Sequence, residues 1–332
     1  MSKAKFISTT LYLCALLFVL IAIDVCVGSS NIFKLEASNS LFETILYQIR
    51  LPKTITCVLA GSGLALCGLL MQTLFRNPLA GPYALGVSSG ASLFVAIATM
   101  LITSIQLFDV YLLGKSIITV FSMLGAFFVT SIILFISKKN KSNIVILLVG
   151  LMLAQVLGAF QSLIEYLSSA DSLKTFIMWS MGNVSNTTLS DLSYMLPFFV
   201  IAVCWSYFLI KPLNAILLNE EYAQNLGVNV SKLRLSIIII TTLLVGVITA
   251  FCGPIAFVGI SVPIASRLFF KTSHHAHQIT FCLLLGAVVL LLADVICQII
   301  SSELVMPINT VTTLLGAPIV MYLLFKSKLN IS

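Results

Sequence analysis

Charged residues are scarce in this chain of 332 residues, of which only 9% are charged while 59% are hydrophobic. A soluble domain is about one quarter charged, so the chain lacks the polar surface that a water-soluble fold would need. The mean hydropathy of +1.12 points the same way. The composition therefore excludes a soluble globular protein and indicates one that lives in a membrane.

The short motifs of common enzyme active sites are also missing. The sequence has no G-x-x-x-x-G-K-[ST] phosphate loop, no H-E-x-x-H zinc motif and no G-x-S-x-G nucleophile elbow. Gly114-Lys115-Ser116 looks like the end of a phosphate loop, but Asp109 stands where the loop needs its first glycine. We therefore predict that the chain is not an enzyme and binds no cofactor directly.

The sequence has few patterns typical of metal binding or of nucleic-acid binding. The eight cysteines lie in or beside apolar runs and form no C-x-x-C pair, which is typical of small buried hydrophobic residues. The one histidine cluster, His274, His275 and His277, is expected in a solvated cytoplasmic turn rather than around a metal. The net charge of +7 is spread over short clusters between apolar blocks, which argues against nucleic acid as a partner.

Apolar runs of about twenty residues, long enough to cross a bilayer, follow one another from end to end. Because the segments look alike, we predict a single transmembrane domain over residues 1–332. The ten predicted spans are 6–27, 54–75, 84–105, 115–137, 143–167, 192–211, 235–252, 254–270, 279–300 and 308–325.

Basic residues decide the orientation, because lysine and arginine gather in cytoplasmic loops. With the N-terminus inside, thirteen of the 18 basic residues fall on the cytoplasmic side. Both termini are therefore predicted to be cytoplasmic, in a multi-pass protein.

Three connections are long. Segment 28–53 carries Leu41, Ile45 and Ile49 at helical spacing and is expected to lie on the outer membrane surface. Inner segment 212–234 is expected to hold a short helix over 219–225 that ends at Gly227. The outer connection 168–191 has room for another short helix.

Polar residues inside spans usually face protein or water rather than lipid. Gln155, Gly158, Ser162 and Glu165 share one face of the fifth span, where they either line a pathway or hydrogen-bond to a neighbouring helix. Asp294 and Gln298 are one turn apart in the ninth span. Gly86-x-x-x-Gly90 is more typical of close helix packing than of chemistry.

Several motifs occur in a fixed order along the chain. They are Arg50-Leu51-Pro52-Lys53, Gln72-Thr73-Leu74-Phe75-Arg76-Asn77-Pro78-Leu79-Ala80-Gly81-Pro82, Leu226-Gly227-Val228, Gly253-Pro254-Ile255-Ala256-Phe257-Val258-Gly259 and Leu315-Gly316-Ala317-Pro318. Together they resemble the FecCD-type permeases, the transmembrane subunits of bacterial ABC importers for ferric siderophores, haem and cobalamin. The R-N-P-L-A-x-P block is the most specific part.

The resemblance implies an all-α integral membrane protein with about ten transmembrane helices, in the permease fold of the cobalamin importer (a type II ABC importer). It places the chain in the bacterial cytoplasmic membrane and implies import of a metal chelate, with a ferric siderophore as the first expectation and haem or cobalamin next. The implied partners are two separate ATPase subunits, a periplasmic or lipid-anchored substrate-binding protein, and a second permease subunit in a homodimer or paired heterodimer.

The same resemblance suggests roles for particular residues. Asn77 and Leu79 match an inner gate loop, and Ser142 and Asn143 lie near a second gate. The positions that match the ATPase-coupling helix are Glu220, Glu221, Ala223, Leu226 and Gly227, and Ala223 and Leu226 are expected to share its docking face. Arg50 and Lys53 match outer positions that meet the binding protein.

This chain departs from the family pattern at three positions. Ile264 stands where histidine is usual, Asn219 replaces a glycine, and Gln298 replaces an outer arginine. The alternative function is a transporter or channel that works alone, with Asp294 and Glu165 as its ion sites and a broken helix near Gly253-Pro254 as its binding site.

Overall fold

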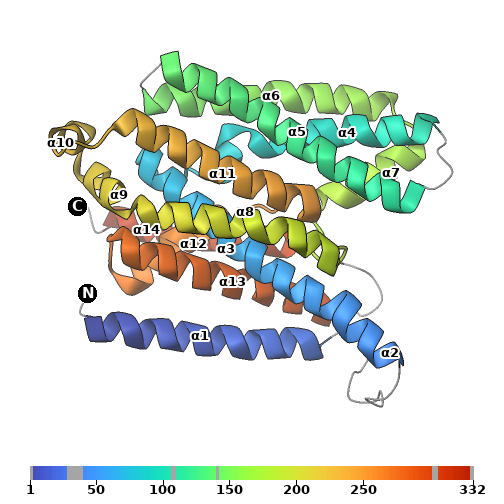
Figure 1. Ribbon diagram of the computed structural model, residues 1–332, viewed down its shortest axis with the longest axis horizontal. Coiled ribbons are helices and arrows are strands. Elements are labelled where there is room, and N and C mark those ends of the chain that lie inside the picture. The colour runs from blue at the N-terminus through green and yellow to red at the C-terminus, as the bar shows by residue number, and fades with distance from the viewer. Residues whose placement is uncertain (1–2, 28–39, 106–109, 140–141, 301–305, 330–332) are drawn as a thin grey trace. The chain divides into compact units, whose positions relative to one another are not determined.

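The structure is a computed structural model that describes residues 3–27, 40–105, 110–139, 142–300 and 306–329. These residues form helices and no strand (Figure 1), so the predicted all-α class is confirmed. A helix stands at each of the ten predicted spans. They are α1 Lys3–Cys26, α3 Leu51–Phe75, α4 Val87–Ile105, α5 Val110–Lys139, α6 Asn143–Leu167, α8 Leu189–Phe208, α11 Val230–Cys252, α12 Val258–Phe270, α13 His275–Ile300 and α14 Ile308–Leu329.

Seven helices in the described part of the chain are long and apolar enough to cross a membrane. The three remaining spans, at α4, α12 and α14, contain shorter apolar helices. Smaller elements connect them: α2 Ser40–Glu43, the 3₁₀ helix η3 Pro82–Leu85, α7 Ala170–Ser180, α9 Ile210–Leu218 and α10 Glu220–Asn225. The short helices expected in the 168–191 and 212–234 connections are therefore confirmed.

Segment 28–53 was predicted to lie on the outer membrane surface, and this prediction is wrong for its described part, residues 40–53. Residues Thr44–Arg50 form a π-helix, η2, that runs without interruption into α3. Pro52 lies inside this continuous helix, two residues after η2, and the local π-helical turn accommodates its missing N–H. Leu41 in α2, and Ile45 and Ile49 in η2, therefore belong to one continuous helix with α3. Residues 28–39 lie outside the described residues.

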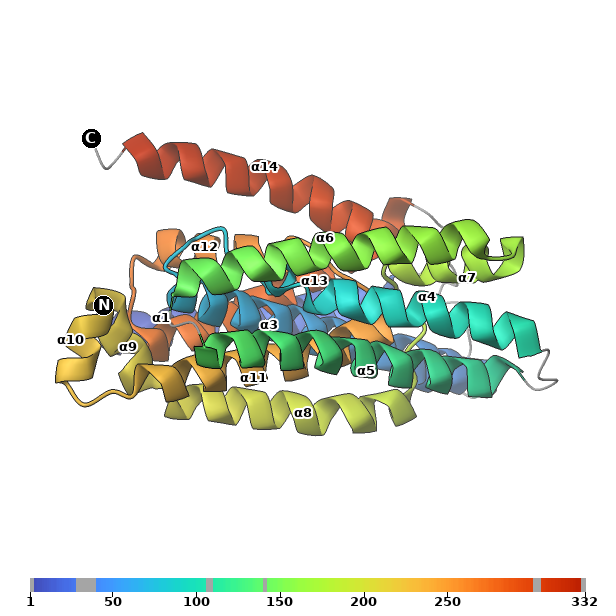
Figure 2. The same cartoon turned by 90° about the horizontal axis from the view of Figure 1, so that it is seen from above.

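The helices group into two compact units, each built from separated stretches of sequence. The first comprises Met1–Leu69, Asn183–Ile210 and Ile255–Ser332, and the second comprises Leu70–Gly182 and Lys211–Pro254. In the first unit α1 lies beside α13, and α12 packs against α13 and α14 (Figures 1 and 2). In the second unit α5 packs against α4 and α11, while α6 packs against α4.

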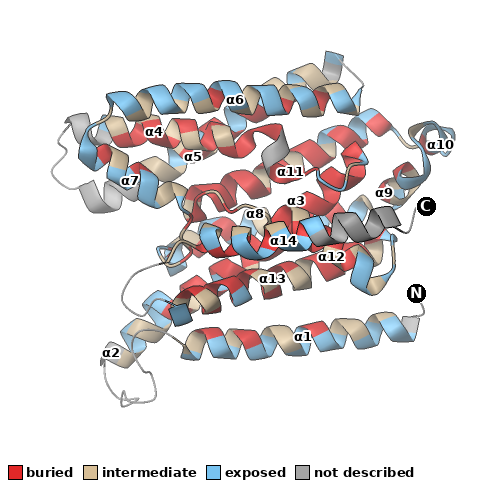
Figure 3. Ribbon diagram, turned by 180° about the vertical axis from the view of Figure 1, so that it is seen from behind, coloured by how far each residue is buried: buried red, intermediate tan, exposed pale blue. Residues whose placement is uncertain are grey.

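Burial differs sharply between the helices. Figure 3 shows α3 and α11 buried along most of their length, whereas α1 and α6 expose much of their surface. Phe127, Phe160 and Ile201 are among the many large apolar side chains that are exposed. Lipid is the natural solvent for such side chains, because it removes them from water as a protein core does.

Glycines allow several helix pairs to approach closely. A Cβ added to Gly61 in α3 would lie 2.3 Å from the carbonyl oxygen of Gly286 in α13, and the reverse distance is also 2.3 Å. In the second unit Gly90 of α4 meets Gly125 of α5 in the same way, at 2.6 Å. The packing role expected of Gly90 is therefore confirmed, because small residues let helix backbones touch in a membrane.

We expect Gly61→Val to destabilise the protein by about 1–3 kcal/mol, since the added side chain would overlap the backbone of α13. Gly158→Val is the matched control, because a Cβ added at Gly158 would have nothing within 4 Å. Thermal unfolding in detergent would measure both variants. Equal midpoints for Gly61→Val and the parent would contradict the close contact between α3 and α13.

Candidate functional site

The loop after α3 begins with a sharp change of direction. Arg76 has a φ of +48°, in the left-handed region that side chains rarely adopt, and its guanidinium donates to the carbonyl oxygen of Ile216 at 2.9 Å. Asn77 then accepts from the backbone N–H of Leu79 at 2.9 Å. The side chain of Leu79 is 48% exposed, so the turn presents an apolar residue at the tip of the loop.

The first residues of α6 lie against the end of α3. Ser142 caps α6 by accepting from the N–H of Val145. The Asn143 side-chain amide donates to the carbonyl oxygen of Leu74 at 2.9 Å and to a carboxylate oxygen of Glu220 at 2.5 Å. The structure thus brings together residues that the sequence assigned to the gates and to the coupling helix.

Helix α10 ends as its sequence predicts. The N–H of Val228 donates to the carbonyl oxygen of Ala223 and that of Gly227 to Gln224, which is the Schellman arrangement of a helix stop. Gly227 supplies the required positive φ, +82°. At the other end Glu220 and Glu221 occupy the first turn, where the helix dipole favours negative charge.

The expected docking face of α10 is wrong in one respect. Ala223 is fully buried, at 0% exposure, whereas Leu226 is 60% exposed. The two residues therefore do not form one exposed face, and Ala223 packs within its own chain. Tyr222, which is 48% exposed, lies on the accessible surface together with Leu226.

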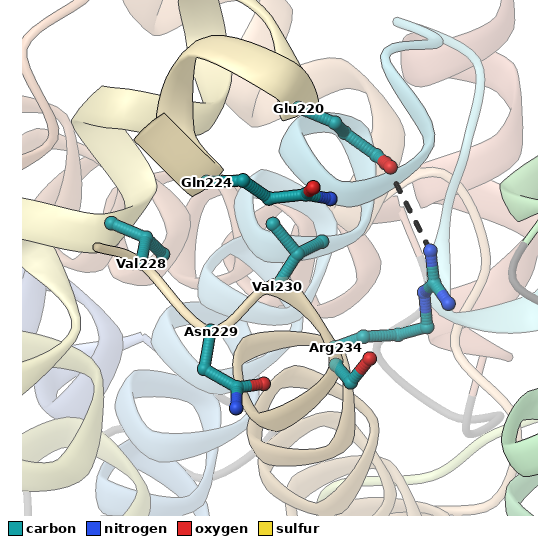
Figure 4. Close-up of a pocket in the computed structure, with 7 residues that line it drawn as sticks. Glu220, Gln224, Val228, Asn229, Val230 and Arg234 are labelled. Carbon is teal, nitrogen blue, oxygen red and sulfur yellow. Dashed lines mark ion pairs between the residues drawn. The ribbon is translucent and has the colours of Figure 1, made fainter. Parts of the chain in front are cut away.

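A polar pocket of about 260 Å³ lies between α10 and α11 (Figure 4). Its wall includes Glu220, Gln224, Asn229 and Arg234. The guanidinium of Arg234 is 3.9 Å from the carboxylate of Glu220, and only 3% of its side chain is exposed. Sequence reasoning missed this role of Arg234, although a cation at the start of a long apolar run was a usable signal.

The polar stripe on α6 faces outward from this chain. Gln155 and Ser162 are exposed, and a Cβ at Gly158 would have nothing within 4 Å. Glu165 is half-buried and accepts from Gln161 of the same helix at 2.8 Å. Exposure of this stripe favours a surface that faces water or another subunit over hydrogen bonding to a helix of the same chain.

A second polar cluster lies in the first unit, among α1, α3 and α13. The Lys53 ammonium is 2.7 Å from Asp294 and 4.0 Å from Asp24. Gln298 donates to both carboxylates, at 2.8 Å to Asp24 and 2.6 Å to Asp294, and Thr54 donates to Asp24 at 2.6 Å. We call these five residues the Lys53 cluster.

The two residues predicted to meet a binding protein are buried in the single chain. Lys53 is 6% exposed and Arg50 is 5% exposed. Arg50 donates to the carbonyl oxygens of Val25 and Cys26 at the end of α1, where helix carbonyls have no partner in their own helix. Asp24 was overlooked in the sequence, although a lone carboxylate in an apolar run is a signal in itself.

Of the three clustered histidines, His274 is exposed in the turn before α13, as expected, whereas His275 and His277 lie within α13. His275 is buried at 1% exposure, so the prediction is wrong for this residue. His277 is half-buried, with its ring centroid 4.4 Å from that of Phe6, and His274 is exposed. No group of three or more His, Cys, Asp or Glu side chains suited to a metal occurs within the described ranges.

These features define a helical membrane protein with several spans and with one polar cluster described in each compact unit. These are the Lys53 cluster in the first unit and the contacts of Asn143, Glu220 and Arg234 in the second. The chain belongs to the FecCD transport family, whose model matches residues 11–326. It is 32% identical over 318 residues to the vitamin B12 import system permease protein BtuC of Klebsiella pneumoniae, covering 94% of this chain and 92% of the relative. The corresponding protein of Salmonella typhi is 34% identical over 313 residues, covering 94% and 93%.

The fold has a close counterpart among solved structures. A transporter described as of the metal-chelate ABC type, captured in an inward-facing conformation, superposes with a TM-score of 0.85 at 27% identity. The superposition covers 96% of this chain and 99% of that one. The permease fold expected from the sequence is therefore confirmed.

Proposed function

We propose that this chain is the permease subunit of an ATP-binding-cassette importer that carries a metal chelate into the cytoplasm. Two separate ATPase subunits would power it, and an external binding protein would deliver the chelate. A second permease subunit, identical or related, would complete the pathway. Both termini and α10 would face the cytoplasm, as the distribution of basic residues predicts.

The observation that carries this proposal is similarity along the whole chain, in sequence and in fold. The relatives at 32% and 34% identity are vitamin B12 permeases, and the solved counterpart is a metal-chelate transporter. Cobalamin, ferric siderophores and haem are all bulky metal chelates that cannot cross hydrocarbon unaided. The substrate class that we propose is therefore a metal chelate.

The packing of the second unit supports the proposed orientation. The loop after α3, the start of α6 and α10 belong to three connections that charge places on the cytoplasmic side. Hydrogen bonds from Asn143 to Leu74 and Glu220 bring these connections together. Asn77, Leu79, Ser142 and Asn143 would then surround the inner mouth of the pathway.

We assign different tasks to the remaining predicted residues. Tyr222 and Leu226 of α10 would contact the ATPase, while Gln155, Ser162 and Glu165 would face the pathway or the second subunit. Arg50 and Lys53 would hold α1, α3 and α13 in the arrangement that the binding protein meets. Their burial makes this positioning role more natural than direct contact.

Uptake by proteoliposomes tests the proposal. The permease is reconstituted with its ATPase, ATP is trapped inside, and the binding protein is added outside with labelled cobalamin, ferric siderophore or haem. We expect uptake of one chelate class that requires both ATP and the ATPase, because the permease carries no P-loop of its own. Uptake by the permease alone, driven by a proton or sodium gradient, would contradict the proposal.

That contrary result would favour the transporter that works alone, with Asp294 and Glu165 as ion sites. The surroundings of Asp294 speak against it. Its carboxylate is 2.7 Å from the Lys53 ammonium and accepts from Gln298, so two side chains of the same chain already hold it. A gradient-driven ion site needs a carboxylate that can exchange its partner for the coupling ion.

A further inference from the structure

One amide joins three elements of the second unit. A side-chain amide has two N–H donors, and Asn143 directs one to Leu74 of α3 and the other to Glu220 of α10. Asn143 itself is the first residue of α6. Any displacement of α10 that carries Glu220 with it must therefore break or pull this bond.

The contact with α3 is made at a sensitive position. Leu74 is the penultimate residue of α3, and its carbonyl is among the last four of the helix, which have no partner within it. The predicted gate residues Asn77 and Leu79 follow after the strained Arg76. The Asn143 amide therefore stabilises the end of the helix from which the gate loop departs.

The contact with α10 is the stronger of the two. Its acceptor is a carboxylate, and hydrogen bonds to charged groups are about twice as strong as neutral ones. The guanidinium of Arg234, from α11, lies on the same carboxylate oxygen at 3.9 Å. The polar pocket beside Glu220 and Arg234 leaves space around this carboxylate, so Glu220 can shift without displacing a packed apolar core.

We propose that Asn143 and Glu220 form a latch through which α10 controls the end of α3 and the gate loop. In the structure described here, Glu220 of α10 accepts a hydrogen bond from Asn143, and Asn143 donates a second one to the carbonyl oxygen of Leu74. When the ATPase moves α10, the hydrogen bond between Glu220 and the Asn143 amide breaks or changes direction. The end of α3 then loses this support, and the gate loop that follows it changes position. The latch rests on the proposed function, because it needs an ATPase that acts on α10.

The test separates ATPase binding from gate movement. A cysteine replaces Leu79 in an otherwise cysteine-free permease, and its labelling rate in inside-out vesicles is measured with and without a non-hydrolysable ATP analogue. We expect the parent complex to show a nucleotide-dependent rate. Asn143→Ala and Glu220→Ala should abolish that dependence and, in the native background, lower uptake at least tenfold, while the ATPase still co-purifies and hydrolyses ATP.

Two further variants sharpen the result. Glu220→Gln keeps an oxygen that can accept from Asn143, so it should recover most of the nucleotide response lost in Glu220→Ala. Lys232→Ala removes an exposed charge from the first turn of α11 and should behave as the parent does. If Asn143→Ala does not insert, the Glu220→Ala and Glu220→Gln pair carries the same comparison.

Each other outcome overturns a different claim. A parent-like nucleotide response and uptake in Asn143→Ala would overturn the latch, as would a Glu220→Gln variant no better than Glu220→Ala. Loss of ATPase co-purification in Asn143→Ala would also overturn it, since the residue would then act through docking. A parent permease that neither captures an ATPase nor responds to nucleotide would refute the proposed function instead.

Discussion

Replacing Lys53 by methionine is expected to destabilise the protein by about 3–5 kcal/mol, the usual cost of removing one partner from a buried ion pair. Methionine preserves the apolar stem but leaves Asp24 and Asp294 without their cation. Both carboxylates are almost fully buried, with 0% and 6% of their side chains exposed. Thermal unfolding in detergent, together with the amount of protein inserted in membranes, measures the loss.

The double variant Lys53→Met/Asp294→Asn is the matched control. It removes one positive and one negative charge, so the Lys53 cluster keeps its original net charge. The remaining carboxylate, Asp24, still accepts from Thr54 and Gln298. We expect the double variant to be clearly more stable than Lys53→Met alone. Equal stability of the two variants, or a parent-like single variant, would show that the ion pair contributes little.

Leu226→Asp is expected to weaken ATPase binding at least about tenfold, which corresponds to about 1.4 kcal/mol, without destabilising the permease. The side chain is 60% exposed, so the change disturbs no core, but it places a charge on the proposed contact surface. Leu226→Met is the conservative control and should bind normally. Co-purification of the ATPase and unfolding of the permease alone are the two measurements.

Ala223→Trp is expected to destabilise the permease itself, in contrast to Leu226→Asp. Because Ala223 is buried within its own chain, a large side chain there is expected to lower the stability of the isolated permease by about 1–3 kcal/mol. Normal stability combined with lost ATPase binding would restore Ala223 to the docking face that the sequence suggested. Normal ATPase binding by Leu226→Asp would remove Leu226 from that face.

The spans were predictable because each is a long apolar run with few charges, a signal that needs no knowledge of neighbours. The end of α10 was equally local, since Gly227 can adopt a positive φ that other residues avoid. The burial of Ala223 was not predictable. A helix of six residues is too short for its periodicity to tell which face meets the protein.

The contacts of Asn143 with Glu220 and those within the Lys53 cluster could not be predicted from the sequence. Asn143 and Glu220 are 77 positions apart, and no pattern in one sequence announces that their helices meet. The two halves of the Lys53 cluster are more distant still, with Asp24 and Gln298 separated by 274 positions. The sequence marked most of these residues as candidate functional residues, but only the fold shows which residues they contact.

The outward face of α6 has a consequence for how the protein is made. Hydrocarbon is a poor solvent for Gln155, Ser162 and Glu165, so a newly inserted chain on its own leaves this face in an unfavourable environment. Any neighbour that covers the face, or any water-filled space beside it, relieves that cost. If that neighbour is the second permease subunit proposed above, the bilayer would favour the assembled pair over the solitary chain, and unassembled chains would be the population most exposed to cellular quality control.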